Sequence, residues 1–359
     1  MLGDTRLAAE TAVVDARLRF GVWALVHGSR GAYGDPEEPY DASWERNRAL
    51  VLEAEELGYD LTLFAQHTVN PRDDALDELE PWTAAAALAA LTHRIELVAA
   101  IKPLLYHPVV LAKLALQIEH ISRGRFALNV VNAWNKAEFD GAGIAFPPHD
   151  QRYAYGREWL GIVEALLRGE RVNHEGPHFQ VRDYMLRPAG THRPRPRIYT
   201  GGESDPARSL AAEHGDVWFI NGRPLDEVEL LLADLRRRPR GGRPPLRYAL
   251  SAFVIARASA AEAHEHYEHL LHLADEDAKR PRARPRNVDP EVVMHQVHQH
   301  RRTIGTNGGS AADLIGSYDE VATRIRAFGR AGIDTFLLMF QPFEADMRGF
   351  AKHVLPGLR

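Results

Sequence analysis

An asparagine inside an apolar segment is the first residue of this chain that suggests chemistry. Residues 126–131 form an almost unbroken apolar run rich in β formers, which is typical of a fully buried parallel strand. Asn129 interrupts the run, and a buried amide is costly unless its hydrogen bonds are satisfied. Asn129 either bonds neighbouring backbone or faces a ligand inside a barrel. The long loop after the strand, which contains Trp, Gly and Pro, favours a ligand, because α/β enzymes carry their chemistry at the carboxyl ends of parallel strands.

A glycine pair before a predicted helix forms the second candidate site. Gly201-Gly202 end a strand, and Ser204-Asp205-Pro206 begin a helix that ends at His214-Gly215. Two glycines let a ligand approach the backbone, and the free amides and positive dipole of a helix N-terminus attract phosphate. The same residues also fit an ordinary N-cap, since Ser and Asp are preferred there. Neither a GxxxxGK[ST] loop nor a Rossmann fingerprint is present.

The 18 histidines raise the question of a metal site or a catalytic base. Four of them share one predicted helix with glutamates: His264, His266, His269 and His272. They lack HExxH spacing, which favours a solvated helix face, so we predict no metal site. His67 and His107 differ, because each follows a predicted strand end and would lie on the catalytic face of a barrel. A Ser/His/Asp hydrolase is not supported, because no GxSxG motif occurs.

Composition limits the class of protein. A chain of 359 residues with 45% hydrophobic content can bury a large core as one or two domains. A net charge of -5 with both signs interspersed gives no support for nucleic acid or membrane as a partner. No apolar run approaches the ~20 residues of a membrane span, no secretory signal is visible, and zero cysteines exclude disulfides and thiol nucleophiles. We therefore expect a cytoplasmic protein.

The elements that must position these residues alternate between strand and helix. Eight strands are predicted, at residues 18–26, 59–64, 95–101, 126–131, 197–200, 217–220, 248–255 and 335–340. Such alternation predicts an α/β fold, a (β/α)8 TIM barrel with insertions, although an open doubly wound sheet would give the same pattern. We expect a single domain over residues 1–359, with insertions near 171–187 and 274–313. The first favours a hairpin around Glu175-Gly176, and the second a lid or a disordered segment.

Four segments together resemble the bacterial-luciferase-like flavin monooxygenases: NVVNAWNKAEFDGAG, HDQRY, YTGGESDPA and LIGSYDEVATRIRAFGRAGIDTFLL. The chain is most similar to the two-component dimethylsulfone, alkanesulfonate and pyrimidine monooxygenases within that family, from about residue 18 to the C-terminus. The resemblance implies a luciferase-like (β/α)8 barrel that binds reduced FMN at the carboxyl ends of its strands. It thus agrees with the independent strand count.

The resemblance also implies a set of cofactor-binding residues: Gln66, His67, Asn129, Glu138, Arg152, Tyr153, Gly201, Gly202 and Ser204. In this set Asn129 would face the isoalloxazine, and Ser204 with the glycine pair would hold the phosphate. We take Asn129, His67 and Trp134 as the candidate catalytic residues. Two simpler interpretations stay open, namely Glu138 as a solvated loop charge and Tyr153 as a core residue at a helix start.

The chemistry implied by the resemblance is the reaction of reduced FMN (FMNH2) with O2 to a flavin (hydro)peroxide, which oxygenates a small organic substrate. The expected partner is a separate NAD(P)H:FMN reductase, and family members are commonly homodimers or homotetramers. Two alternatives remain, an F420-dependent oxidoreductase of the same fold and a flavin-binding barrel without turnover.

Departures from the family patterns bear on the substrate. Alkanesulfonate monooxygenases carry a Cys after the second strand and Arg-x-His on the seventh, where this chain has no Cys and reads Ser251 to Phe253 as SAF. Pyrimidine monooxygenases place a Thr where this chain has Ala100, which weakens an N5-peroxide route. A small neutral sulfone is the expected substrate, in an apolar pocket to which four aromatic residues near strand ends would contribute: Trp23, Tyr106, Trp134 and Phe340.

Overall fold

The computed structural model describes residues 17–29, 31–279 and 302–359. In these ranges eight parallel strands pair edge to edge into a closed barrel, in the order β1 (Arg19–Trp23), β2 (Leu61–Phe64), β3 (Glu96–Ile101), β4 (Phe126–Val130), β7 (Arg197–Gly201), β8 (Val217–Ile220), β9 (Arg247–Arg257) and β11 (Thr335–Met339). The pairings of β8 with β9 and of β11 with β1 close the ring. The predicted (β/α)8 barrel is therefore confirmed, and an open sheet is excluded.

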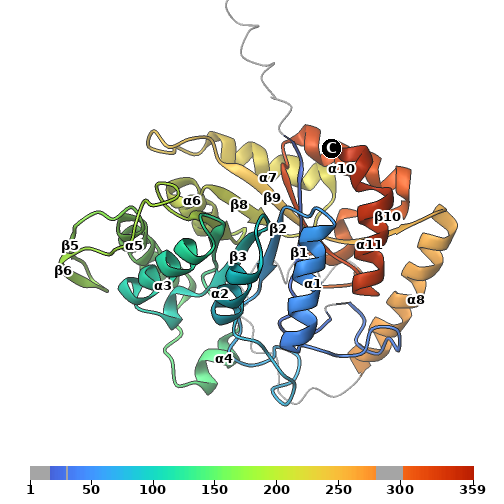
Figure 1. The fold of residues 1–359 in the computed structure, drawn as a ribbon, viewed down its shortest axis with the longest axis horizontal. Coiled ribbons are helices and arrows are strands. Elements are labelled where there is room, and N and C mark those ends of the chain that lie inside the picture. The colour runs from blue at the N-terminus through green and yellow to red at the C-terminus, as the bar shows by residue number, and fades with distance from the viewer. Residues whose placement is uncertain (1–16, 30, 280–301) are drawn as a thin grey trace, which may run out of the picture.

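Helices surround the barrel, most of them on its outer side and one, residues 136–141, below it in the view of Figure 1. They are α1 (Trp44–Glu56), α2 (Pro81–Leu91), α3 (Pro108–Ile121), α4 (Lys136–Gly141), α5 (His149–Leu167), α6 (Asp205–His214), α7 (Leu225–Arg237), α8 (Ala260–Lys279), α10 (Tyr318–Ala331) and α11 (Phe343–His353). Local signals explain their ends. Ser317 and Glu320 form a capping box at the start of α10, and Gly332 ends that helix in the left-handed conformation.

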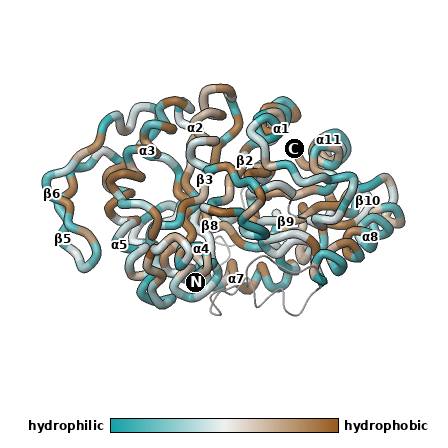
Figure 2. The backbone as a smooth tube through the Cα atoms, turned by 90° about the horizontal axis from the view of Figure 1, so that it is seen from below, coloured by the Kyte–Doolittle hydropathy of each residue, from teal (hydrophilic) through white to brown (hydrophobic). Residues whose placement is uncertain are grey.

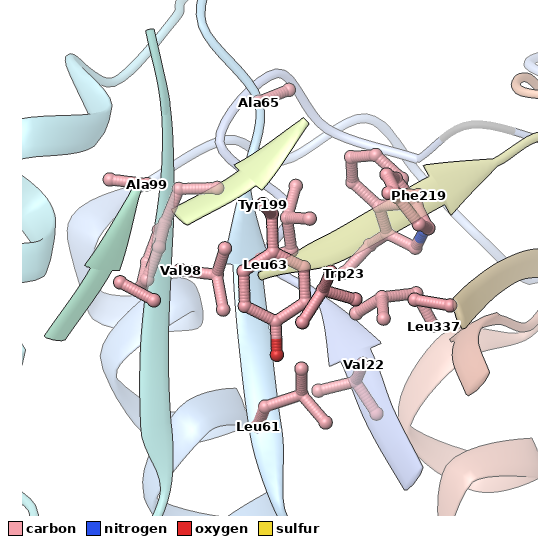
Figure 3. Packing of buried hydrophobic residues seen from close by; sticks show 14 of the residues in the cluster. Val22, Trp23, Leu61, Leu63, Ala65, Val98, Ala99, Tyr199, Phe219 and Leu337 are labelled. Atoms are coloured by element: carbon pink, nitrogen blue, oxygen red, sulfur yellow. The ribbon is translucent and has the colours of Figure 1, made fainter. Parts of the chain in front are cut away.

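Apolar side chains fill the barrel, and a polar cluster closes its amino-terminal end. Figure 3 shows the Tyr199 hydroxyl directed toward Leu61, while Phe219 lies at the opposite end of the packed residues. The buried Glu96 carboxylate receives hydrogen bonds from Arg19 and Arg197 at 2.6 Å each and from the Tyr199 hydroxyl at 3.2 Å. These buried groups thus bond to one another at this end, and the site has to be sought at the carboxyl ends of the strands.

Two excursions lie at opposite ends of the molecule (Figures 1 and 2). One is the antiparallel hairpin of β5 (Val172–Glu175) and β6 (Gln180–Tyr184), which turns where the sequence indicated. The other is α8 with β10 (Leu314–Ser317), a strand that we did not predict. It pairs with the distal part of β9 outside the barrel, where its register begins at Leu314 opposite Val254.

Some boundaries differ from the prediction. Residues 274–279, assigned to a structureless insertion, are the end of α8, and α5 begins at His149 rather than Tyr153. Much of the predicted lid, residues 280–301, falls outside the described residues. In the part that the structure does describe, no helix is long and apolar enough to cross a membrane.

Candidate functional site

A cavity of about 700 Å³ opens at the carboxyl ends of the barrel strands. Trp23, Leu63 and Phe219 form its apolar floor, where the Trp23 and Phe219 rings lie 5.8 Å apart between centroids. The cavity is lined by every residue that the sequence analysis named as catalytic or cofactor-binding: Gln66, His67, Asn129, Trp134, Glu138, Arg152, Tyr153, Gly201, Gly202 and Ser204. These residues come from three segments of the chain, which follow β2, run from β4 into α5, and connect β7 to α6, and closure of the barrel brings them together.

Asn129 lies on β4 between Ala100 of β3 and Tyr199 of β7 in the strand register. Its side chain is buried, and its Oδ1 atom has no hydrogen-bond partner among the described residues. Of the two interpretations of Asn129, a hydrogen bond from neighbouring backbone to its side-chain oxygen is therefore wrong. A buried amide oxygen without a partner is costly for the protein. Its position in the cavity wall suits it to bind a ligand donor.

The glycine pair and Ser204 form a backbone cradle beside α6. Gly202 has φ +105°, and a Cβ atom there would lie 2.9 Å from Ala207 Cβ and 3.0 Å from the Tyr153 hydroxyl. Ser204 is the N-cap of α6, yet its side chain makes no capping bond, and its buried Oγ has no partner within the described chain. The ordinary N-cap interpretation thus fails for the hydroxyl. A hydroxyl and free amides at a helix start suit an anionic oxygen group.

Arg152 and Tyr153 reach the cavity from the first turns of α5. Arg152 is buried and donates to the carbonyl of Pro147 at 2.7 Å, and its guanidinium lies 4.2 Å from the Phe146 ring centroid. These contacts fix the side chain against the loop that precedes α5. Tyr153 is buried next to Gly202, with its ring 4.8 Å from that of His149. Tyr153 is therefore both a packed residue and part of the cavity wall.

Glu138, on α4, joins the loops that follow β2 and β3. Its Oε1 accepts the backbone N–H of Thr68 at 2.7 Å, and its Oε2 lies 2.6 Å from the Lys102 ammonium and 3.5 Å from His67 Nδ1. Burial alone would raise the pKa of Glu138, but its contacts with His67 and Lys102 lower it to about 2. The interpretation of Glu138 as a solvated loop charge is wrong, because its side chain is only 1% exposed.

Lys102 is a site residue that sequence reasoning missed. It directly follows the buried strand β3 and lines the cavity with a fully buried side chain. Burial lowers its pKa from the usual 10.5, and the Glu138 carboxylate opposes that shift. The sequence did contain a signal for Lys102, because it is a lone charged residue at the carboxyl end of an apolar strand. His67 was selected from the same kind of position.

Trp134 lies in a row of rings along the cavity wall. The His67 ring packs edge to face with Trp134 and with His27, and both pairs of ring centroids are 5.7 Å apart. Ala133, just before Trp134, has φ 45°, a conformation that costs a non-glycine residue of order 1 kcal/mol. His27 was not predicted, although it follows the first strand as His67 follows the second.

Other expectations for the cavity are wrong. Tyr106 and Phe340 do not line it, because Tyr106 precedes α3 and Phe340 packs against Phe343 and Phe350. His107 is also outside the cavity and serves as the N-cap of α3. Within the described ranges no three His, Cys, Asp or Glu side chains are grouped so as to hold a metal ion.

Comparisons with known proteins agree on the fold. A family model described as luciferase-like monooxygenase matches residues 18–335. The FMNH2-dependent dimethylsulfone monooxygenase of Pseudomonas putida is 29% identical over 324 residues, covering 88% of this chain and 89% of that protein. A riboflavin lyase solved with modified FMN and riboflavin has a TM-score of 0.76 at 23% identity, covering 96% of this chain and 91% of its own. An F420-dependent secondary alcohol dehydrogenase has a TM-score of 0.70 at 17% identity, covering 96% of this chain and 99% of that chain.

Proposed function

This chain belongs to the luciferase-like monooxygenase family, and on that basis we propose that it is a reduced-FMN-dependent monooxygenase of a small organic substrate. One observation carries the proposal beyond family membership. Asn129 and Ser204 bury oxygens that have no partner in the described part of the chain, and both line the same cavity, together with Gly201-Gly202. A ring system with polar edges and an attached phosphate would satisfy both oxygens at once.

The residues of this chain fit the parts of FMN in a consistent way. Ser204, the amides at the start of α6 and the glycine cradle suit the phosphate, while Asn129 suits the ring system. Reduced FMN would supply the two electrons that activate O2, so that substrate, O2 and FMNH2 give oxygenated substrate, water and FMN. The protein then has to orient the reactants and exclude water, and the apolar floor of the cavity serves the second task.

A neutral organosulfur compound, such as a small sulfone, is the substrate class that we propose. The similarity to a dimethylsulfone monooxygenase supports it. Electrostatics support it as well. Ser251, Ala252 and Phe253 of β9 are buried and uncharged, and Ser251 accepts the Trp23 indole N–H at 3.3 Å. The buried cations Lys102 and Arg152 are already bonded to protein oxygens, so they offer a sulfonate less than an uncommitted cation would.

The proposal includes a second protein. A monooxygenase that takes up FMN already reduced needs a source for it, so an NAD(P)H:FMN reductase is the partner we propose, which makes the system a two-component one. The single-domain organisation, the homodimeric or homotetrameric state and the cytoplasmic location remain predictions alongside it. Size-exclusion chromatography with light scattering would test the oligomeric state.

The deciding experiment mixes purified protein anaerobically with reduced FMN or with reduced F420 and follows cofactor fluorescence. We expect tight binding of reduced FMN and little binding of F420. An O2 pulse with dimethylsulfone should then give a product one oxygen heavier, or a C–S cleavage product, with matched oxygen uptake. Binding of F420 alone would refute the cofactor assignment. FMN binding without substrate-coupled oxygen uptake across a panel of organosulfur compounds would indicate a barrel without turnover.

A further inference from the structure

Lys102 contacts the acceptor atoms of two neighbouring cavity residues, Gln66 and His67. Its backbone N–H donates to Gln66 Oε1 at 2.7 Å, and its ammonium lies 3.4 Å from His67 Nδ1. The same ammonium lies 2.6 Å from Glu138 Oε2. All four residues are at most 9% exposed, so these contacts form in a largely water-free part of the wall.

The positive charge of this cluster belongs to Lys102. Glu138 is ionised, because the Thr68 N–H and hydroxyl both donate to its Oε1, at 2.7 and 3.1 Å. A buried carboxylate needs a cation beside it. Lys102 lies closer to Glu138 than His67 does, at 2.6 against 3.5 Å. Burial lowers the pKa of Lys102, but the Glu138 carboxylate at 2.6 Å opposes that shift, and this closer contact places the proton on Lys102.

The charge on Lys102 fixes the tautomer of His67. An ammonium group has only donors, so its contact with Nδ1 is favourable only if Nδ1 carries no proton, which puts the proton of the neutral ring on Nε2. A bond from Nδ1–H to Glu138 would also lower the pKa of that carboxyl, but it would span 3.5 Å, no shorter than the contact with Lys102, and it would place the Nδ1 proton beside the ammonium. The Lys102 backbone N–H can likewise only donate, so it holds the oxygen of the Gln66 amide and leaves the NH2 end for other partners.

We propose that Lys102 is a positioning residue that gives the Gln66–His67 pair donor polarity. Its backbone and its side chain occupy the acceptor atoms of the two residues, so any ligand that the pair binds must accept a hydrogen bond from it. The ligand group that fits has acceptor atoms, either a carbonyl of the flavin ring or an oxygen of the substrate. The choice of ligand rests on the proposed function, whereas the polarity rests on these contacts alone.

The polarity can be tested on the FMN-free protein, independently of any activity. Nitrogen NMR of protein labelled with ¹⁵N-histidine distinguishes a pyrrole-type nitrogen that bears a proton from a pyridine-type nitrogen that does not. The loss of signals in His67→Gln assigns the residue. In the wild type at neutral pH we expect Nε2 to be pyrrole-type and Nδ1 pyridine-type. A protonated Nδ1 in the wild type would overturn the proposal.

Variants at Lys102 show whether it is the cause. In Lys102→Met the donor to Nδ1 is lost and Glu138 faces the ring, so we expect the proton to move to Nδ1. The double variant Lys102→Met/Glu138→Gln leaves no unpaired buried charge, and we expect it to fold and to lose the fixed Nε2 tautomer. Lys136→Met is the matched control. Lys136 is on the same helix as Glu138, but its ammonium pairs with Asp140 at 2.6 Å. An unchanged tautomer in both Lys102 variants would contradict the proposal.

Ligand addition identifies the acceptor. A shift of the His67 Nε2 signal on adding FMN would assign the acceptor to the flavin. A shift that appears only when dimethylsulfone is added to the FMN-loaded protein would assign it to the substrate. If FMN binds and neither addition moves the signal, the donor pair does not serve the ligand and that half of the proposal is wrong. Failure of FMN to bind would count against the proposed function and leave the tautomer result standing.

Discussion

At the scale of single residues, Asn129 and Ser204 are informative because each buries an oxygen that the described protein leaves without a partner. Such oxygens are rare in folded proteins, since the lost hydrogen bonds with water are not replaced. Their location on different elements suggests different tasks. Asn129 projects from a barrel strand, and Ser204 lies at the start of a helix.

Asn129→Ala should reduce coupled oxygenation far more than FMN affinity. In the proposed function, the substitution removes the polar group that would face the flavin ring and leaves the proposed phosphate site unchanged. The measurement compares the rate of product formation with the Kd for reduced FMN, and hydrogen peroxide release reports uncoupled turnover. A variant with wild-type coupling would remove Asn129 from the reaction.

Ser204→Ala should have the opposite effect. Loss of one hydrogen bond to the phosphate should weaken FMN binding by about 1 kcal/mol, roughly fivefold in Kd, with little change in the coupled rate at saturating FMN. Riboflavin, which lacks the phosphate, provides the control ligand, and its affinity should not respond to the substitution. Equal FMN affinity in the two proteins would place the phosphate elsewhere.

At the scale of elements, the loop from β7 to α6 carries the backbone geometry of the site. Gly202 adopts φ +105°, and its carbonyl accepts the Trp218 indole N–H at 2.9 Å, which holds the loop against β8. The space beside Gly202 Cα is occupied by Ala207 and the Tyr153 hydroxyl. The positive φ and the close packing therefore both require glycine at this position.

Gly202→Ala should impair both stability and FMN binding. The new methyl group would lie 2.9 Å from Ala207 Cβ and 3.0 Å from the Tyr153 hydroxyl, and the positive φ adds strain of about 1–3 kcal/mol. Gly143→Ala is a matched control, because Gly143 also has positive φ, +71°, but nothing lies within 4 Å of its added Cβ. Chemical denaturation and FMN titration of both variants give the comparison. Equal FMN affinities in the two variants would show that the cradle does not touch the cofactor.

At the scale of the whole molecule, buried carboxylates tie the barrel together and make its stability depend on pH. Glu96 closes the amino-terminal end of the barrel, Glu138 links the loops after β2 and β3, and Glu164 pairs with Arg243 and His214. The pKa of each is lowered by these partners, even though burial would raise it. Such groups bind fewer protons in the folded than in the unfolded chain.

The free energy of unfolding should therefore fall as the pH falls below the ordinary glutamate value of 4.5. For Glu138, the folded pKa of about 2 means that its contribution is complete above pH 4.5 and lost as the pH falls toward 2. At 1.36 kcal/mol per pKa unit, that contribution is at most about 3 kcal/mol. Denaturant titrations at several pH values should show a shallower slope in Glu138→Gln than in the wild type. Glu213→Gln, which alters an exposed pair with Arg157, should keep the wild-type slope.

The sequence by itself determined the order of elements and the candidate residues attached to them. Apolar runs at strand length alternate with helical periodicity, so the barrel could be predicted, and the polar residues at strand ends followed from that alternation. Asn129 stood out because it interrupts such a run, and Gly201-Gly202 because they precede a helix start. These signals are local, since the period of a segment depends only on neighbouring positions.

Only the tertiary structure decided which of these residues meet and what they bond. His67 follows β2, Lys102 follows β3 and Glu138 is on α4, and nothing in the spacing between positions 67, 102 and 138 shows that barrel closure brings their polar atoms within 3.5 Å. Tyr106 and Phe340 were wrongly assigned to the cavity, because a position near a strand end does not fix the direction of the side chain. Contacts across loops depend on strand register and closure, which no local pattern encodes.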